Sequence, residues 1–168
     1  MKNFKLCFYI SLFLTMVFGK STINIGMQAP DFQLPDQDST IHKLSDYIGS
    51  TIVLYFFPMA DTPGWTKEAC GFRDKFEIYE SANTKIIGVS FDTPDKLKSF
   101  RNKYKIPYTF LSDRKKTVAR MYDAKGWFFP KRVTFIIDET GTIQKIIRNV
   151  NVNTHGEDIL EMLDKSDK

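Results

Sequence analysis

One continuous apolar segment, residues 51–57 (TIVLYFF), limits the possible folds of this chain more than any other feature. Strands that face water on one side alternate polar and apolar residues, whereas this segment carries no charged residue. We therefore expect a strand buried on both faces, at the centre of a sheet with helices on each side. Pro58 follows directly and ends the strand. The segment predicts an α/β fold.

Strand and helix patterns alternate along the rest of the chain. Thr62 and Pro63 are typical of a helix start, as N-cap and first helical residue. The apolar stripe of this helix contains Ala69, Phe72, Phe76 and Tyr79. Further strands are predicted at residues 29–32, 41–47, 85–91, 108–111, 132–138 and 142–148. Three further helices are predicted. The first is capped by residues 92–94 and reaches residue 104. The second is capped by residues 112–113 and reaches about residue 122, and the third spans residues 155–165.

The order of these elements predicts how the strands pair. Helices separate the early strands, which are therefore parallel, whereas a turn at residues 139–141 joins the last two strands as an antiparallel hairpin. The result is a mixed central sheet with helices on both faces. A thioredoxin-like fold has this order, and the pattern alone also allows other small α/β folds.

The first residues have the pattern of a secretory signal peptide. Lys2 and Lys5 supply positive charge, and residues 6–18 are apolar and uncharged. That run is too short to span a bilayer comfortably, so we expect cleavage after Gly19 and export to a periplasm, the exterior or a secretory lumen. The alternative is an uncleaved membrane anchor. Residues 20–168 are enough for one domain, without stable membrane association after cleavage.

Removal of the signal peptide leaves a small net charge and one thiol. Loss of two lysines and no acidic residue lowers the formal charge from +4 to +2. Residues 114–116 are the only basic triplet, so nucleic-acid binding is not expected. Cys70 is the one remaining cysteine, which excludes an internal disulfide. His42 and His155 are isolated and lack zinc-ligand spacing, so we expect no metal or other cofactor.

Three segments together resemble one enzyme family. Residues 58–74 (PMADTPGWTKEACGFRD) resemble the active-site loop and first helix of the peroxiredoxins, in the Q-type group also called bacterioferritin comigratory proteins. Residues 130–138 (PKRVTFIID) resemble the strand that delivers the family's active-site arginine, and residues 26–32 (GMQAPDF) resemble the family's start. The similarity covers roughly residues 25–165. It implies a thioredoxin-like fold within the alkyl hydroperoxide reductase and thiol-specific antioxidant superfamily.

The resemblance implies an antioxidant activity, the reduction of hydrogen peroxide and organic hydroperoxides with electrons from thioredoxin or a similar thiol. In this chemistry a cysteine thiolate attacks the peroxide O–O bond. By the motif, Thr62 and Arg132 would orient the peroxide and stabilise the leaving oxygen, and Pro58 would shield the pocket from water. In the simpler interpretation Thr62 is only an N-cap and Arg132 only a salt-bridge partner. Many Q-type members are monomers, and we expect a monomer or weak dimer.

The chain departs from the family at the residue that matters most. Trp65 stands where the family has its peroxidatic cysteine, and indole offers an N–H donor but no ionisable nucleophile. Its size predicts that it fills or caps the peroxide pocket. Cys70 takes the place of the resolving cysteine, but five helical residues rotate it by about 140° and advance it by about 7.5 Å, away from the pocket. The simpler interpretation of Cys70 is a free, half-buried helical cysteine.

Three hypotheses follow from this departure. The first is a catalytically impaired peroxiredoxin that serves as a binding or structural protein. The second is an active peroxidase that uses Cys70 as its only sulfur. The third is a recoded selenocysteine at position 65, which would restore a chalcogen nucleophile where Trp65 is written. Near Arg132, residues 127–129 (WFF) form either an apolar rim for a partner or substrate, or ordinary packing.

Overall fold

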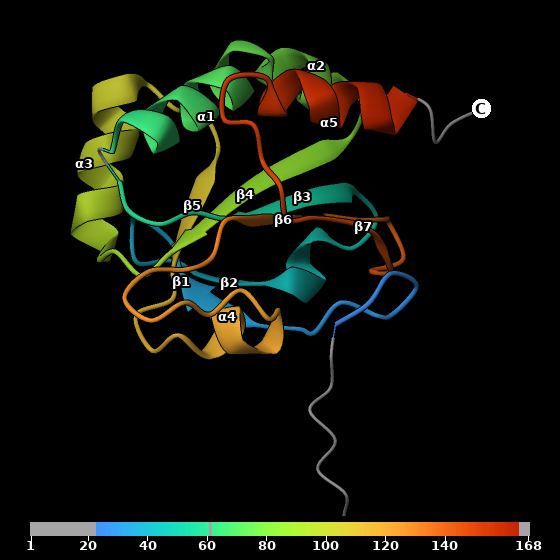
Figure 1. Cartoon of the computed structure of the whole chain (residues 1–168), viewed down its shortest axis with the longest axis horizontal. Helices are drawn as coiled ribbons and strands as arrows, with labels where there is room; N and C mark the ends of the chain where they lie inside the picture. The colour runs from blue at the N-terminus through green and yellow to red at the C-terminus, as the bar shows by residue number, and fades with distance from the viewer. Residues whose placement is uncertain (1–22, 61, 165–168) are drawn as a thin grey trace, which may run out of the picture.

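The computed structural model describes residues 23–60 and 62–164. The predicted signal peptide, residues 1–19, lies outside the described residues, as does residue 165 at the end of the last predicted helix. The described chain forms a five-stranded sheet between two layers of other elements (Figure 1). None of the helices in this part of the chain is long and apolar enough to cross a membrane.

The central sheet has the mixed topology that the sequence predicts. Its strands lie in the order β5-β4-β3-β6-β7. The strands are β3 (Thr51–Phe56), β4 (Thr84–Ser90), β5 (Thr109–Ser112), β6 (Val133–Ile137) and β7 (Ile143–Ile147). The pairs β3–β4 and β4–β5 are parallel, whereas β3–β6 and β6–β7 are antiparallel. The apolar run therefore forms the central strand, as predicted.

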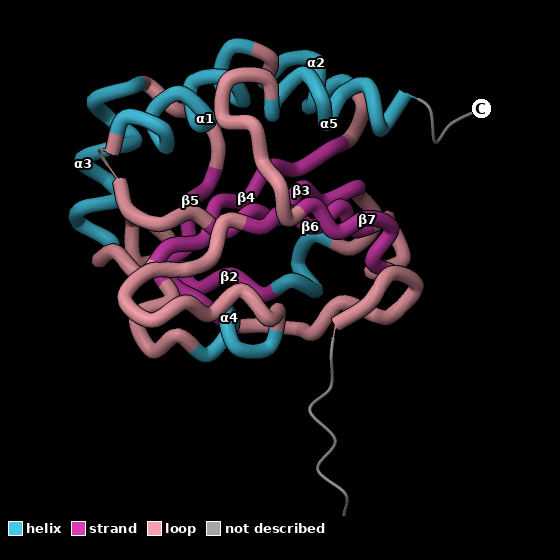
Figure 2. The backbone as a smooth tube through the Cα atoms, viewed as in Figure 1, coloured by secondary structure: helices cyan, strands magenta, loops and turns pink. Residues whose placement is uncertain are grey.

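Helices cover one face of the sheet and a mixed layer covers the other. The first layer contains α1 (Pro63–Asp74), α2 (Phe76–Ser81), α3 (Pro94–Tyr104) and α5 (His155–Asp164). The second layer contains β1 (Gln33–Pro35), β2 (Ile41–Lys43), the 3-10 helix η1 (Leu44–Tyr47) and α4 (Thr117–Met121). Figure 2 shows the two layers on opposite sides of the strands. The prediction of helices on both faces is confirmed.

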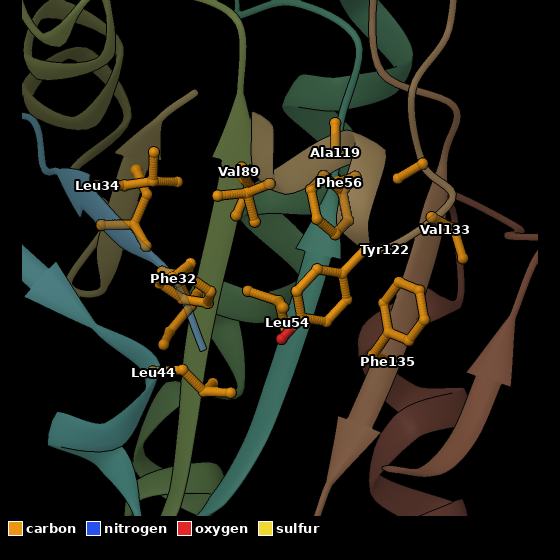
Figure 3. Packing of buried hydrophobic residues seen from close by; sticks show 14 of the residues in the cluster. Phe32, Leu34, Leu44, Leu54, Phe56, Val89, Ala119, Tyr122, Val133 and Phe135 are labelled. Atoms are coloured by element: carbon orange, nitrogen blue, oxygen red, sulfur yellow. The ribbon is translucent and has the colours of Figure 1, made fainter. Parts of the chain in front are cut away.

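Alternate residues of β3 enter different cores because successive side chains of a strand point to opposite faces. Val53 and Tyr55 pack with the layer of four helices, and the loop residue Phe57 extends this alternation. Leu54 and Phe56 pack with the layer that contains α4, in the cluster that Figure 3 shows. Among the described residues, the first that packs into a core is Ile23.

The N-terminal strands differ from their predicted bounds. The strand predicted at residues 29–32 is wrong, because Ala29 N instead donates to Gly141 O at the sheet's terminal hairpin, and β1 begins only at Gln33. The strand predicted at 41–47 ends at Lys43. The carboxylate of Asp46 accepts a hydrogen bond from Lys43 N (2.8 Å), which turns the chain into the 3-10 helix.

Two predicted helices also differ from the structure. The stripe of the first helix is interrupted at Lys75, where the backbone leaves the helical region (ψ 10°) and separates α1 from α2. The helix predicted from residue 112 begins only at Thr117. The buried Asp113 carboxylate delays it, because it accepts hydrogen bonds from Thr117 N and Ala119 N at 2.9 and 2.8 Å.

Candidate active site

The loop between β3 and α1 brings the Pro58–Thr62 motif to one end of the sheet. Thr62 has an extended backbone and precedes Pro63, which is the first residue of α1, as predicted. The Thr62 hydroxyl does not cap the helix; it donates to Met59 O at 3.1 Å. Thr66 N closes the first helical turn on Thr62 O at 2.9 Å. Thr62 therefore holds the loop against the start of the helix.

Trp65 points into the protein core. Its side chain is completely buried and stacks on Phe57, with ring centroids 3.5 Å apart and planes 3° apart. Tyr55, Phe100 and Phe110 surround it at centroid distances of 5.3, 5.4 and 5.5 Å. We expected the indole to fill or cap a pocket beside Thr62 and Arg132, but its ring contacts are with aromatic residues of β3, α3 and β5. Its Nε1 has no hydrogen-bond partner among the described residues.

Arg132 lies next to the start of α1, as the sequence-based assignment requires. It immediately precedes β6, and its guanidinium forms an ion pair with Glu68 of α1. The Glu68 side chain is fully buried, whereas that of Arg132 is 24% exposed. A methyl group at Gly64 would lie 3.9 Å from an Arg132 guanidinium nitrogen. The arginine therefore approaches the first turn of the helix that Thr62 precedes.

The ion pair continues into a buried polar cluster. His155 Nε2 lies 2.8 Å from the Thr134 hydroxyl and 3.7 Å from Glu68 Oε1. Burial raises the pKa of Glu68 to about 7, although the Arg132 guanidinium acts in the opposite direction. Burial also lowers the pKa of His155 to about 4. Within the part of the chain that the structure describes, Glu68 Oε1 has no hydrogen-bond partner.

The sequence did not identify Glu68, Thr134 or His155 as members of this cluster. The three residues come from α1, β6 and α5, and Glu68 and Arg132 are separated by 64 positions. Their spacing in the sequence does not indicate that they form one polar cluster. The available signal was chemical, since a carboxylate on a buried helix face requires a cationic partner.

Cys70 is a free, half-buried cysteine on another side of α1. Glu68 faces Arg132, and two further helical residues rotate the chain by about 200°. Cys70 therefore projects away from the guanidinium, which agrees with the expectation from the sequence. The structure places Arg132 beside Gly64, in the first turn of the helix that Thr62 precedes, and Cys70 projects from another side of that helix.

Pro58 lines a separate surface groove of about 310 Å³. Phe128 and Phe129 line the same groove, together with Phe91, Asp92, Arg114 and Lys116. The residues 127–129 are not ordinary packing, because Trp127 is 86% exposed and Phe128 is 72% exposed. An exposed aromatic rim beside Pro58 is therefore present.

The two histidines form hydrogen bonds within the protein. His42 lies 3.0 Å from an Asp36 carboxylate oxygen and 2.6 Å from the Tyr47 hydroxyl. Among residues 23–60 and 62–164, no group of three or more His, Cys, Asp or Glu side chains is arranged to hold a metal ion.

Known proteins share both the sequence pattern and the fold. The profile of the AhpC/TSA family matches residues 25–146. Peroxiredoxin Q of Gentiana triflora is 40% identical over 136 residues, which cover 79% of this chain and 62% of that protein. The putative peroxiredoxin bcp of Coxiella burnetii is 39% identical over 150 residues, which cover 84% of this chain and 99% of that protein.

Solved structures agree with this assignment. Peroxidoxin BcpB of Mycobacterium tuberculosis superimposes with a TM-score of 0.79 at 34% identity, over 84% of this chain and 96% of that one. A mutant of PrxQ from Xylella fastidiosa gives a TM-score of 0.84 at 29% identity, over 88% and 99% of the two chains. The predicted thioredoxin-like fold is confirmed. The chain belongs to the AhpC/TSA family, in the group of peroxiredoxins named Q or Bcp.

Proposed function

We propose that this chain is a peroxiredoxin that keeps the surroundings of a hydroperoxide site but lacks its thiol nucleophile. The family activity is thiol-dependent reduction of hydrogen peroxide and organic hydroperoxides, with thioredoxin or a similar thiol as reductant. For this chain we propose that the activity is absent or very weak. The observation that carries the proposal is the complete burial of Trp65 at the start of α1, where no sulfur is present.

The chemistry explains why this residue decides the activity. A thiolate attacks one peroxide oxygen, the O–O bond breaks, and the sulfur becomes a sulfenic acid while the other oxygen leaves as water or an alcohol. A helix N-terminus and a nearby arginine would stabilise the thiolate and the leaving oxygen. Thr62 and Arg132 supply these surroundings in the proposed site, whereas Pro58 lines a separate groove with Phe128 and Phe129. Indole at position 65 has no lone pair available for the attack.

A direct test supplies the missing nucleophile. Trp65→Cys places a thiol in the first turn of α1, next to Gly64, which lies beside Arg132, and is expected to gain rapid reaction with hydrogen peroxide. Trp65→Ser is the matched control, since it leaves the same space and has no sulfur. A folded Trp65→Cys protein that reacts no faster than Trp65→Ser would contradict the proposed roles of Thr62 and Arg132. Circular dichroism of both variants establishes that each is folded.

Peroxidase activity through Cys70 is the second candidate. It requires a thiol that reaches peroxide without Arg132, because Cys70 projects from another side of α1. Mass spectrometry after one equivalent of hydrogen peroxide tests it. We expect Cys70 to be oxidised no faster than free cysteine, and faster formation of a sulfenic acid or an intermolecular disulfide at this residue would support the alternative.

A recoded selenocysteine at position 65 is the third candidate, and one observation favours it. Buried tryptophan N–H groups usually find a hydrogen-bond partner, but Trp65 Nε1 has none. The mass of residue 65 in protein from the native host distinguishes the two residues. Tryptophan at this position would exclude selenocysteine, and selenium would replace the proposal of an impaired site.

We also propose that the protein is exported after removal of residues 1–19 and that it is a monomer or weak dimer. The charged and apolar pattern of residues 2–18 supports export. N-terminal sequencing of the native protein is expected to start at Lys20. A native chain that starts at Met1 would contradict cleavage.

A further inference from the structure

We propose that residues 126–129 form a membrane-docking loop that inserts aromatic side chains into the interface of an anionic lipid bilayer. This inference goes beyond the proposed function and holds whether or not residue 65 is catalytic. It concerns reversible binding at a surface, since no helix in the described residues could cross a membrane. The loop lies between α4 and β6, and Arg132 follows it.

The loop exposes three consecutive aromatic side chains. Trp127, Phe128 and Phe129 are 86%, 72% and 46% exposed, and these residues form a bend rather than a helix or strand. Nothing comparable occurs elsewhere in the described chain, where the other large exposed hydrophobic side chains are single aliphatic residues. Exposed clusters of this kind mark interaction sites. Tryptophan in particular is suited to the bilayer interface, because its ring is apolar and its N–H is polar.

The shape of the loop is built into the fold. A methyl group at Gly126 would lie 2.0 Å from Phe129 O, so the turn closes more tightly than any other residue allows. Lys116 Nζ donates to Trp127 O at 3.1 Å, and Lys131 N donates to Ala124 O at 2.7 Å. These contacts hold the backbone on both sides of the aromatic residues. The side chains are thus presented outward from a fixed turn, which lowers the entropy lost on binding.

The charge around the loop favours an anionic surface. The side chains of Lys115 and Lys125 are exposed, and Lys116 and Lys125 border the hollow beside Trp127. Neither Lys116 nor Lys125 has a carboxylate partner among the described residues. Asp123, which precedes the loop, faces Lys131 at 3.9 Å and Arg148 at 3.6 Å, and Asp92, which lines the groove with Phe128 and Phe129, pairs with Lys96 at 2.6 Å. Cations next to inserted aromatic residues bind anionic headgroups, as at other interfacial sites.

A lipid surface fits this loop better than a protein partner does. A stable protein interface buries on the order of 800 Å² on each side and contains a packed apolar centre. Here the apolar residues are three neighbours in one turn, with charged side chains around them, which suits shallow insertion between headgroups. In the docked state the groove shared by Pro58, Phe128 and Phe129 faces the lipid.

Vesicle binding tests the proposal. The chain that begins at Lys20 contains every described residue of both cores, so it is the form to use. Its binding to vesicles of equal parts phosphatidylcholine and phosphatidylglycerol is measured by co-sedimentation and by tryptophan fluorescence. Of the chain's two tryptophans Trp65 is buried, so a blue shift on binding reports Trp127. We expect binding that weakens as salt is added.

Matched variants separate the loop from the rest of the surface. Trp127→Ser with Phe128→Ser is expected to lower the partition coefficient by roughly tenfold or more, because two buried aromatic side chains are lost. The control, Ile25→Ser with Ile78→Ser, removes two exposed aliphatic residues elsewhere (62% and 56% exposed) and should leave binding unchanged.

A second pair of variants tests the contribution of the lysine charges to vesicle binding. Lys115→Gln with Lys125→Gln is expected to weaken binding severalfold, whereas Lys67→Gln with Lys105→Gln removes equal charge at distant exposed sites with little effect. No vesicle binding, or equal binding by loop and control variants, would overturn the proposal. So would a dimer that the loop variants dissociate, because the loop would then be occupied by a second copy.

Discussion

The Trp65 indole lies flat against the Phe57 ring, with centroids 3.5 Å apart and planes 3° apart. This contact joins the first turn of α1 to the end of the central strand, inside the core under α1 and α3. Trp65 is therefore a major packing residue, and its replacement affects stability as well as chemistry. The two effects can be separated by variants that change size and polarity independently.

Trp65→Ala is expected to destabilise the protein by about 3–5 kcal/mol, because it leaves a large cavity among four aromatic rings. Trp65→Phe keeps a ring against Phe57 and removes the unpaired Nε1 N–H, whose burial costs about 1–3 kcal/mol. We therefore expect Trp65→Phe to cost less than about 2 kcal/mol. Urea unfolding measures both. An equal loss in the two variants would contradict the packing account.

Arg132 is expected to be structurally important through its ion pair with Glu68. Arg132→Met leaves a fully buried carboxylate without its cation and should cost about 3–5 kcal/mol above neutral pH. Adding Glu68→Gln to this variant should recover part of the loss, since no buried charge then remains. The control is Arg148→Met, whose ion pair with Asp123 is 45% and 44% exposed and is worth less than about 1 kcal/mol. Unfolding curves should show the largest loss for Arg132→Met and smaller losses for Arg132→Met with Glu68→Gln and for Arg148→Met. A different order would contradict the assignment of Arg132 and Glu68 as one buried ion pair.

Glu68 and His155 predict opposite pH dependences of stability. Burial raises the pKa of Glu68 from 4.5 to about 7, so the folded state binds more protons and stability falls as pH rises through this range. Burial lowers the pKa of His155 from 6.5 to about 4, so the unfolded state binds more protons and stability is lost as pH falls through that range. The two contributions to stability oppose each other between pH 4.5 and 6.5. Above pH 6.5 only the contribution of Glu68 still changes with pH.

His155→Asn tests this balance because it removes one of the two opposing groups. The native chain should change little in unfolding free energy between about pH 4.5 and 6.5 and then lose stability toward about pH 7. The variant should lose stability continuously over the whole range. Urea unfolding at a series of pH values measures both slopes. Parallel curves for the two proteins would contradict the assignment of His155.

Two glycines predict opposite responses to alanine. Gly126→Ala places a methyl group 2.0 Å from Phe129 O and should destabilise the protein by more than about 1 kcal/mol while rearranging the aromatic loop. Gly71→Ala is the matched control within α1, where the added methyl group has no atom within 4 Å. It should stabilise the protein by about 0.5–1 kcal/mol, because alanine favours the helix. Thermal unfolding distinguishes the two signs.

The sequence predicted the elements whose signal is local. The apolar run gave the central strand β3, and the turn around Gly141, which has positive φ, gave the β6–β7 hairpin. It failed where a side chain changed the backbone path. Asp46 ends β2 and Asp113 delays α4, and neither effect is visible in hydrophobic periodicity.

The candidate site was predicted only in part. Motif resemblance placed Thr62 and Arg132 at the start of one helix, and the structure has them there. The inward direction of Trp65 was missed, because a helix start allows a large side chain to turn toward either the loop or the core. The cluster of Glu68 and His155 was missed because it forms only when α1 and α5 pack on the same face of the sheet.

The rate of hydrogen peroxide consumption tests the central claim most directly. The purified chain that begins at Lys20, which keeps Cys70 but not Cys7, its Cys70→Ser variant and free cysteine are compared at equal concentration, with excess dithiothreitol as reductant. We predict that the chain reacts no faster than free cysteine and that Cys70→Ser abolishes what remains, because indole cannot replace a thiolate. Consumption far above that of free cysteine would contradict the claim that Trp65 has ended the peroxidase activity.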